Sequence, residues 1–404
     1  MKKFLALSLL SFTISVQAQD PVVQSIVDAV NVDSMMLYVR EIAGELPVDL
    51  GSGELTIETR HKLDPGNALA QTYLEQNLNA WGYDVSVQEF STTGRNVLAT
   101  KQGYVHPDEV VILCAHYDTF VSSPFLAPAA DDDGSGCGAL LEAARVLRDI
   151  PFEYTIVLAF WDEEEQGKIG SIYYATQAAG DDAIIKGVVN MDAIAYDGNG
   201  DKKARLHARP TAANSSAIAD TVFAVLDRYD IDIDLLLTTP GAVYSDHASF
   251  WSSGYGAVLI IEEFTADGNP HYHTPTDLTE YFDVPYFEKL SKLSIASLAT
   301  LAIPFDPTSS VPNVSGVSAT DLSVFPNPSS SDATLVVDVA RTDEYTVSIS
   351  NALGQHVKTI AYSTLSKGAH QFTLVLSDLP PATYVLSIRN SDRVMTTQRV
   401  VRTP

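Results

Sequence analysis

The chain has 404 residues, of which 46% are hydrophobic and 9% aromatic, and its formal net charge is −26. This length suffices for one large domain and one small one. Residues 19–320 carry 44 acidic and 16 basic side chains, which excludes nucleic acid as a partner because phosphate binding needs a basic surface.

The N-terminus, MKKFLALSLLSFTISVQAQD, has two lysines, an apolar run from Phe4 to about Val16, and small residues around Ala18. The run is too short to span a bilayer, so residues 1–18 are predicted to be a cleaved secretory signal. No other stretch approaches the length of a transmembrane helix, so we expect no membrane span. We expect a protein exported through the periplasm to the medium or the cell surface, and a monomer.

Residues 19–60 contain an amphipathic helix that belongs either to the core of the following domain or to a small propeptide. Residues 66–81 have helical periodicity, and Gly82 follows as a stop signal. The next two segments, 84–90 and 96–103, alternate in polarity like antiparallel edge strands.

Four nearly continuous apolar runs then alternate with helix-like stretches. The runs are 110–116, 155–161, 187–192 and 257–263. The helix-like stretches are 138–149, 171–179, 215–229 and 285–302. Strands buried on both faces and separated by helices imply βαβ units. We therefore predict, over residues 19–302, a mostly parallel mixed sheet covered by helices on both faces.

Composition changes after residue 302. Residues 303–320 are rich in Pro, Ser, Thr and Gly without an apolar period, and indicate a linker. Short alternating segments separated by turn residues follow, and they predict a small all-β sandwich over residues 321–404. The only cysteines are Cys114 and Cys137, for which we favour two buried free thiols over a bridge.

Polar side chains stand at the ends of the predicted strands. His116 ends the first apolar run, Glu164 and Glu165 follow the second, and Asp192 ends the third. Asp132 precedes a helix in the segment AADDDGSG, and His273 lies in a polar loop after the fourth run. Because the carboxyl ends of parallel strands meet at one edge, we expect these groups to converge.

Histidine and carboxylate together suit zinc, or less often cobalt or manganese. Two histidines and three carboxylates are too many for one catalytic zinc, but they suit two metals that share a bridging carboxylate. Such a pair activates a water, and a free carboxylate must then take the proton of that water. Adjacent glutamates can divide these roles between ligand and general base.

The ordered motifs HxD, DxxSG, EExG, MD and YHT resemble those of the M28 zinc aminopeptidases, secreted bacterial leucyl-type enzymes, over about residues 30–302. The resemblance implies a phosphorylase/hydrolase-like fold and two Zn²⁺ ions per chain. By position in these motifs, the implied metal ligands are His116, Asp132, Glu165, Asp192 and His273, with Asp132 as the bridge.

The same resemblance implies further roles. Glu164 matches the general base, and Asp118 matches a carboxylate that orients the ligand His116. Tyr272 matches a phenol that donates to the tetrahedral oxyanion in some members, although packing beneath the loop is the alternative. We interpret Asp246 and His247, in the segment SDHASFW, as architectural.

The registers inside DDD (131–133) and EEE (163–165) are open to a slip of one residue. Counting back from the following SG and QG selects Asp132 and the pair Glu164 and Glu165.

The resulting hypothesis is a secreted dizinc aminopeptidase that acts on peptides with a free N-terminus. The alternatives are a family relative with different chemistry, such as a glutaminyl cyclase or a carboxypeptidase, and a surface-binding protein without activity. The side-chain preference at the cleaved N-terminus stays open.

The C-terminal segments VFPNP, SISNALGQHV and LPPATYVLSIRN, with a basic tail, resemble the sorting domain of the type IX secretion system. This resemblance implies the type IX machinery as a partner and removal of the domain during export. Ala382 stands where glycine is commoner in that family. The alternative is an immunoglobulin-like adhesion or carbohydrate-binding domain.

Overall fold

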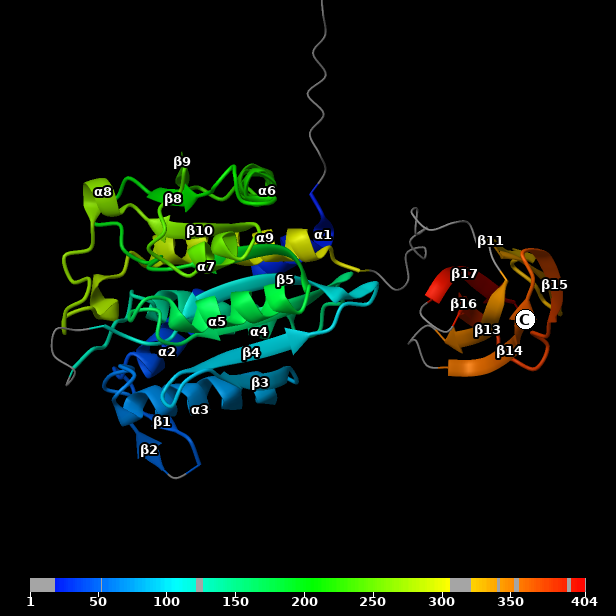
Figure 1. The fold of residues 1–404 in the computed structure, drawn as a ribbon, viewed down its shortest axis with the longest axis horizontal. Helices are drawn as coiled ribbons and strands as arrows, with labels where there is room; N and C mark the ends of the chain where they lie inside the picture. The colour runs from blue at the N-terminus through cyan, green and yellow to red at the C-terminus, as the bar shows by residue number, and fades with distance from the viewer. Residues whose placement is uncertain are drawn as a thin grey trace, which may run out of the picture. The chain divides into compact units, whose positions relative to one another are not determined.

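The computed structural model describes residues 19–51, 53–120, 126–305, 321–339, 342–351, 356–390 and 394–403. The predicted signal, residues 1–18, and most of the predicted linker, residues 306–320, lie outside the described residues. The chain divides into two compact units, which meet in sequence between Phe305 and Asp306 (Figure 1).

A mixed sheet of eight strands forms the centre of the first unit. Its strand order is β3-β4-β6-β5-β7-β10-β8-β9. The strands are β3 (Asp84–Glu89), β4 (Arg95–Lys101), β5 (His106–His116), β6 (Tyr154–Trp161), β7 (Ile184–Met191), β8 (Lys203–His207), β9 (Asp234–Thr238) and β10 (Ala257–Glu262). Strands β6, β5, β7 and β10 run parallel to one another. Strand β4 pairs antiparallel with both β3 and β6, and β8 pairs antiparallel with β10 and parallel with β9.

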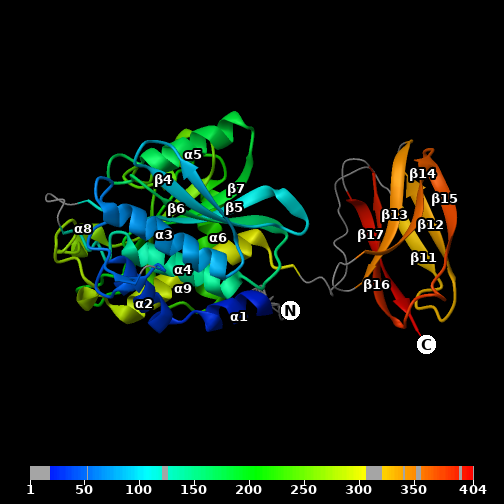
Figure 2. The same ribbon diagram turned by 90° about the horizontal axis from the view of Figure 1, so that it is seen from below.

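Helices cover both faces of this sheet (Figure 2). They are α1 (Pro21–Ala29), α2 (Val32–Ile42), α3 (Pro65–Ala80), α4 (Gly134–Leu147), α5 (Ile169–Gly180), α6 (Ser215–Arg228), α7 (His247–Ser252), α8 (Phe264–Asp267), α9 (Val284–Ala302) and the short 3₁₀ helix η1 (Thr279–Tyr281). Helices α4 and α9 pack on one face, and α5 and α7 on the other. The predicted fold class is thus confirmed.

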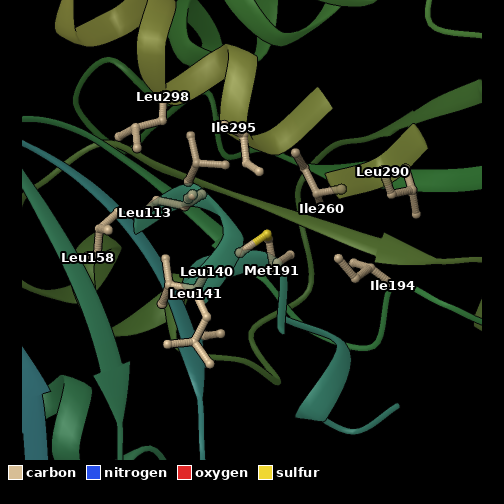
Figure 3. Close-up of a cluster of buried hydrophobic side chains, with 14 of the residues drawn as sticks. Leu113, Leu140, Leu141, Leu158, Met191, Ile194, Ile260, Leu290, Ile295 and Leu298 are labelled. Carbon is tan, nitrogen blue, oxygen red and sulfur yellow. The ribbon is translucent and has the colours of Figure 1, made fainter. Parts of the chain in front are cut away.

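The main core lies between the parallel strands and helices α4 and α9 (Figure 3). Leu113 and Met191, from β5 and β7, are fully buried there with Leu140 of α4 and Ile295 of α9. Burial of each such side chain contributes about 1.5–3 kcal/mol relative to an exposed position. This core holds the ends of β5, β6 and β7 in fixed relative positions.

The first two helices belong to the same core. Met35 and Val39 of α2 are fully buried, and α2 packs closely on α4 because Gly138 of α4 has no side chain. A Cβ atom at Gly138 would lie 2.5 Å from Cγ2 of Val39. Among the described residues, no single helix is long and apolar enough to cross a membrane, although the bent pair α1 and α2 passes that test of length and composition.

Several elements were not predicted from the sequence. Strands β8 and β9 extend the sheet beyond β10, and the segment interpreted only as a motif forms α7 (His247–Ser252). The N-terminal segment forms two helices instead of one. The backbone of Asn31 is extended between them, and its side chain caps α2 by accepting from the Ser34 amide. A two-stranded ribbon, β1 (Val48–Asp49) and β2 (Glu54–Leu55), follows α2.

The second unit contains two antiparallel sheets, with strand orders β11-β12-β15 and β14-β13-β16-β17. The strands are β11 (Asp321–Phe325), β12 (Ala333–Val339), β13 (Asp343–Asn351), β14 (His356–Leu365), β15 (Gly368–Leu374), β16 (Ala382–Arg389) and β17 (Val394–Arg402). Alternate side chains, among them Leu335, Val347 and Leu386, are buried in their common core. This is the all-β region expected after the linker.

Candidate metal centre

Five side chains from five separate segments meet at the carboxyl edge of the central sheet. His116 is the last residue of β5, and Asp192 directly follows β7. Glu165 lies in the turn after β6, Asp132 just before α4, and His273 in the loop after α8. Because β5, β6 and β7 run parallel, their carboxyl ends lie side by side.

The carboxylate of Asp132 lies between two imidazoles. Its Oδ1 is 3.2 Å from Nε2 of His116, and its Oδ2 is 2.9 Å from Nε2 of His273. Nε2 of His273 is also 3.2 Å from Oε1 of Glu165, and Nε2 of His116 is 3.9 Å from Oδ1 of Asp192. The Nε2 atom of each imidazole therefore faces Asp132 and one further carboxylate.

The donor atoms form overlapping groups, each of which could hold a metal ion. One group consists of His116, Asp132 and Asp192, another of Asp132, Glu165 and His273, and in each group the ligand atoms lie within 4.8 Å of one another. Within the described part of the chain, Oδ2 of Asp132, Oε1 of Glu165 and Nε2 of His273 are buried without an aligned hydrogen-bond partner. Buried polar atoms that converge without such alignment are typical of ligands to a shared cation.

The charges in this cluster are strongly coupled. Burial disfavours charged His273, but Asp132 and Glu165 outweigh burial and raise its pKa to about 10. Burial, reinforced by Asp132, raises the pKa of Glu165 to about 8. Burial also raises the pKa of Glu164 well above its ordinary value, and His116 opposes that shift only in part. Without a cation, the site thus retains protons at neutral pH.

The three aspartates of DDD have separate partners. Asp131 accepts from the Ala195 amide at 3.0 Å and from Nδ2 of Asn269 at 3.0 Å. Asp133 caps α4 by accepting from the Gly136 amide at 2.9 Å, and it also accepts from the His116 amide at 3.1 Å. Of the three, only Asp132 lies between the two histidines, which is the register chosen by counting.

The three glutamates of EEE also diverge. Glu163 points away from the histidines and accepts from Thr93 Oγ1 at 2.7 Å and from Lys62 Nζ at 3.2 Å. Glu164 and Glu165 share a potential ligand group with His116, and Glu165 alone approaches His273. The geometry therefore agrees with Glu163 as the extra member.

Asp118 connects β5 to the glutamate turn. Its Oδ1 accepts from the Glu164 amide at 2.9 Å, and its Oδ2 accepts from the Glu165 amide at 3.2 Å. Oδ1 also lies 3.5 Å from Nδ1 of His116. One fully buried carboxylate thus holds the backbone of both glutamates beside the ring of His116.

The ring of Tyr272 lies beside the candidate ligand His273. Its ring stacks on His273 with centroids 3.8 Å apart, and it meets Phe264 edge to face at 5.1 Å. Burial, followed by the charges of Asp132 and Asp192, raises the pKa of its phenol. The side chain stays 39% exposed, so it can contact a ligand above the centre.

Two residues that support the site were not predicted. Asp277 accepts from the amides of Asp131 and Asp132 at 3.0 and 3.2 Å. Arg60 is fully buried, and its guanidinium donates to the carbonyls of Tyr117, Ile42, Pro128 and Ala129. Neither residue belongs to a recognisable motif. Each binds backbone groups of distant segments, and such contacts leave no pattern of residue types in the sequence.

The remaining motif residues are buried beneath the site. His247 donates from Nε2 to the carbonyl of Ala242 at 2.8 Å. Burial raises the pKa of Asp246 to about 7, and its charge contributes to the raised pKa of Glu164. Cys114 and Cys137 are both free and buried, and Cys137 donates to the carbonyl of His116 at 3.2 Å.

Comparison with known proteins identifies both units. The description Peptidase family M28 matches residues 96–298, about half of the chain. The chain belongs to this family. The description Secretion system C-terminal sorting domain matches residues 323–402, so the second unit of this M28 protein is a sorting domain.

Aminopeptidase YwaD of Bacillus subtilis (strain 168) is 29% identical over 208 residues, which are 50% of this M28 chain and 44% of that protein. This chain thus spans about half the length of that relative. The crystal structure of the Legionella pneumophila LapA aminopeptidase has a TM-score of 0.58 at 20% identity and covers 75% of this chain and 80% of its own.

A Bacteroides thetaiotaomicron glutaminyl cyclase bound to N-acetylhistamine has a TM-score of 0.53 at 18% identity, over 67% of this chain and 97% of its own. At such identities the two structures share the fold with this M28 protein. They do not separate peptidase from cyclase.

Proposed function

We propose that this M28 protein is an exported dizinc aminopeptidase that hydrolyses the first peptide bond of substrates with a free N-terminus. The observation that carries the proposal is the division of the Asp132 carboxylate between His116 and His273. This arrangement gives each of two cations one histidine, one private carboxylate and one shared carboxylate, which is the donor set that catalytic zinc prefers. The sorting domain supports export, for which we propose the type IX route.

In this proposal, His116, Asp132 and Asp192 would hold one metal, and Asp132, Glu165 and His273 would hold the other. Two bound zinc ions supply Lewis acidity that acidifies water and polarises a carbonyl. Glu164 takes the proton of the attacking water and passes it to the leaving amine. Its raised pKa in the metal-free protein suits a group that must hold this proton.

Two other side chains have supporting roles in this mechanism. Asp118 fixes His116 and the backbone of Glu164, so that ligand and base keep their spacing. Tyr272, stacked on His273 and partly exposed, donates to the oxyanion that forms on the substrate carbonyl.

The three adjacent glutamates provide a test with a built-in control. We expect Glu164→Gln to keep two zinc ions and lose at least about 100-fold in kcat, since general bases contribute roughly 10²–10⁴-fold. Glu165→Gln should lose zinc as well. Glu163→Gln, whose carboxylate faces Lys62 and Thr93, should retain both metal and turnover.

The measurements are elemental analysis for zinc and hydrolysis of leucine p-nitroanilide with and without a chelator. Near-normal turnover in Glu164→Gln would overturn the assignment of the base. A stoichiometry of one zinc, with release of pyroglutamyl peptides from N-terminal glutamine, would favour a cyclase instead.

A further inference from the structure

We propose that Tyr244, supported by His207 and Arg205, binds an acceptor oxygen of the substrate that is not part of the scissile bond. This inference rests on the proposed function and adds a recognition site to it.

Asp192 and two side chains of β8, Arg205 and His207, lie on the same face of the sheet. Asn190 of β7 is level with Leu259 of β10, which pairs with His207 of β8. Paired residues in adjacent strands point to the same face, and side chains two positions apart do so as well. Asp192 is two residues beyond Asn190, so its side chain lies on the face of His207.

Arg205 occupies the row of Asp192. It pairs with Ile261 of β10, and the Asp192 amide donates to the neighbouring carbonyl of Ile260. Two strand spacings separate the residues, or about 10 Å between backbones. Arg205 and His207 therefore flank the centre on its Asp192 side, two strands away from the strand that carries Asp192.

The hydrogen bonds of His207 fix the direction of the Tyr244 proton. Nδ1 of His207 accepts from the Ala242 amide at 3.0 Å, so in the neutral ring the proton must be on Nε2. Burial and the charge of Arg205 lower the pKa of His207 to about 4, which keeps the ring neutral. Nε2, 3.0 Å from the Tyr244 oxygen, is thus the donor in this contact.

The hydroxyl proton of Tyr244 is consequently free for another acceptor. Among the described residues, His207 is the only hydrogen-bond partner of this hydroxyl, and the Tyr244 side chain is 50% exposed. The ring meets His207 edge to face at a centroid distance of 5.5 Å. The phenol is therefore held in place while its proton faces the open side.

Arg205 provides a second donor in the same neighbourhood. Its Nη2 is 2.6 Å from Oε2 of Glu263, and its Nη1 donates to Thr238 Oγ1 at 3.3 Å. Its Nε is buried and has no acceptor among the described residues. Because Nε of Arg205 is buried, the donor open to a ligand is the Tyr244 hydroxyl, and an oxygen atom of the substrate is a suitable acceptor for its proton.

Two parts of a peptide carry such an oxygen. One is the side chain of an N-terminal residue such as asparagine, and the other is the carbonyl of the next peptide bond. Leucine p-nitroanilide has neither. Asparagine p-nitroanilide adds the first with nearly the same side-chain shape, and the tripeptide Leu-Gly-Gly adds the second.

The test is the ratio of kcat/KM for each oxygen-bearing substrate to that for leucine p-nitroanilide. In Tyr244→Phe, we expect at least one ratio to fall about tenfold, the usual effect of one lost hydrogen bond. Tyr104→Phe is the matched control, because Tyr104 is 66% exposed before the start of β5 and should leave both ratios unchanged. The ratio that falls identifies the source of the oxygen.

Unchanged ratios, or an equal loss on all three substrates, would overturn the proposal. Titration calorimetry of the Glu164→Gln and Glu164→Gln/Tyr244→Phe proteins with Leu-Gly-Gly and asparagine amide measures the same contact without turnover. If the wild type hydrolyses none of the substrates, the proposed function fails. In that case, a tenfold difference in Kd between Glu164→Gln and Glu164→Gln/Tyr244→Phe would still support the subsite, and equal Kd values would refute it.

Discussion

Replacement of Asp118 by asparagine tests how the centre is held together. The Asp118 carboxylate accepts from two adjacent backbone amides, those of Glu164 and Glu165, and also faces His116. Asparagine has the same shape but only one oxygen, so one backbone N–H keeps an acceptor while the other meets an NH₂ group. The negative charge beside the imidazole is lost as well.

The cost follows from these contacts. A hydrogen bond to a charged group contributes about 1.5–3 kcal/mol, and a factor of ten corresponds to about 1.4 kcal/mol. Loss of one such bond at Glu164 or Glu165 predicts a decrease of about 10- to 100-fold in zinc affinity and kcat, which is the usual effect of removing an outer partner of a metal ligand. We expect KM to change little, because Asp118 is fully buried and cannot contact substrate.

The assay is a zinc titration of the chelator-stripped protein, with kinetics on leucine p-nitroanilide. Asp108→Asn serves as the control, because Asp108 is exposed on the same strand, β5. A folded Asp118→Asn protein whose zinc affinity and kcat both lie within twofold of the wild type would refute the role of this carboxylate.

Two further perturbations follow from the same geometry. Arg60→Lys should lower the free energy of unfolding by roughly 2–4 kcal/mol, because an ammonium cannot pair all four carbonyls that the buried guanidinium serves. Urea denaturation beside the exposed control Arg40→Lys measures this, and a loss below about 1 kcal/mol would contradict it. In the metal-free protein, the folded-state pKa values of Glu165 (about 8) and His273 (about 10) are both raised. The folded state therefore binds more protons than the unfolded state, and the free energy of unfolding should fall as pH rises from about 4.5 to 10. Added zinc should stabilise more at pH 8 than at pH 5 because it displaces those protons, and thermal melts with equal zinc responses at both values would argue against this coupling.

The sequence predicted the elements whose physics is local. Strands such as β5 and β7 are apolar over most of their length because both faces are covered, and that pattern is visible without a structure. Strand β8 was not predicted, because three of its five residues (KARLH) have basic or polar side chains and the segment shows no apolar run. Such a segment forms a strand only when residues distant in sequence pair with its side chains. Its Arg205, for example, pairs with Glu263 from a distant loop.

The same distinction applies to the site. Residues at strand ends, such as His116 and Asp192, were predicted because parallel topology brings strand ends together. Arg60 and Asp277 were not, because they bind backbone groups, which leave no pattern of residue types in the sequence. The proposed role of Tyr244 could not be predicted either, because it depends on the tautomer of His207, which follows from hydrogen bonds in the folded protein.

The packing of α2 bears on the stability of the candidate metal centre. Met35 and Val39 of α2 lie against Gly138 of α4, and the capping residue of α4 is Asp133, the neighbour of Asp132. Trimming the chain within residues 21–42 would expose that surface and loosen the helix that positions Asp132. We therefore expect a chain shortened within this segment to lose the geometry of the centre, and a chain shortened before Pro21 to keep it.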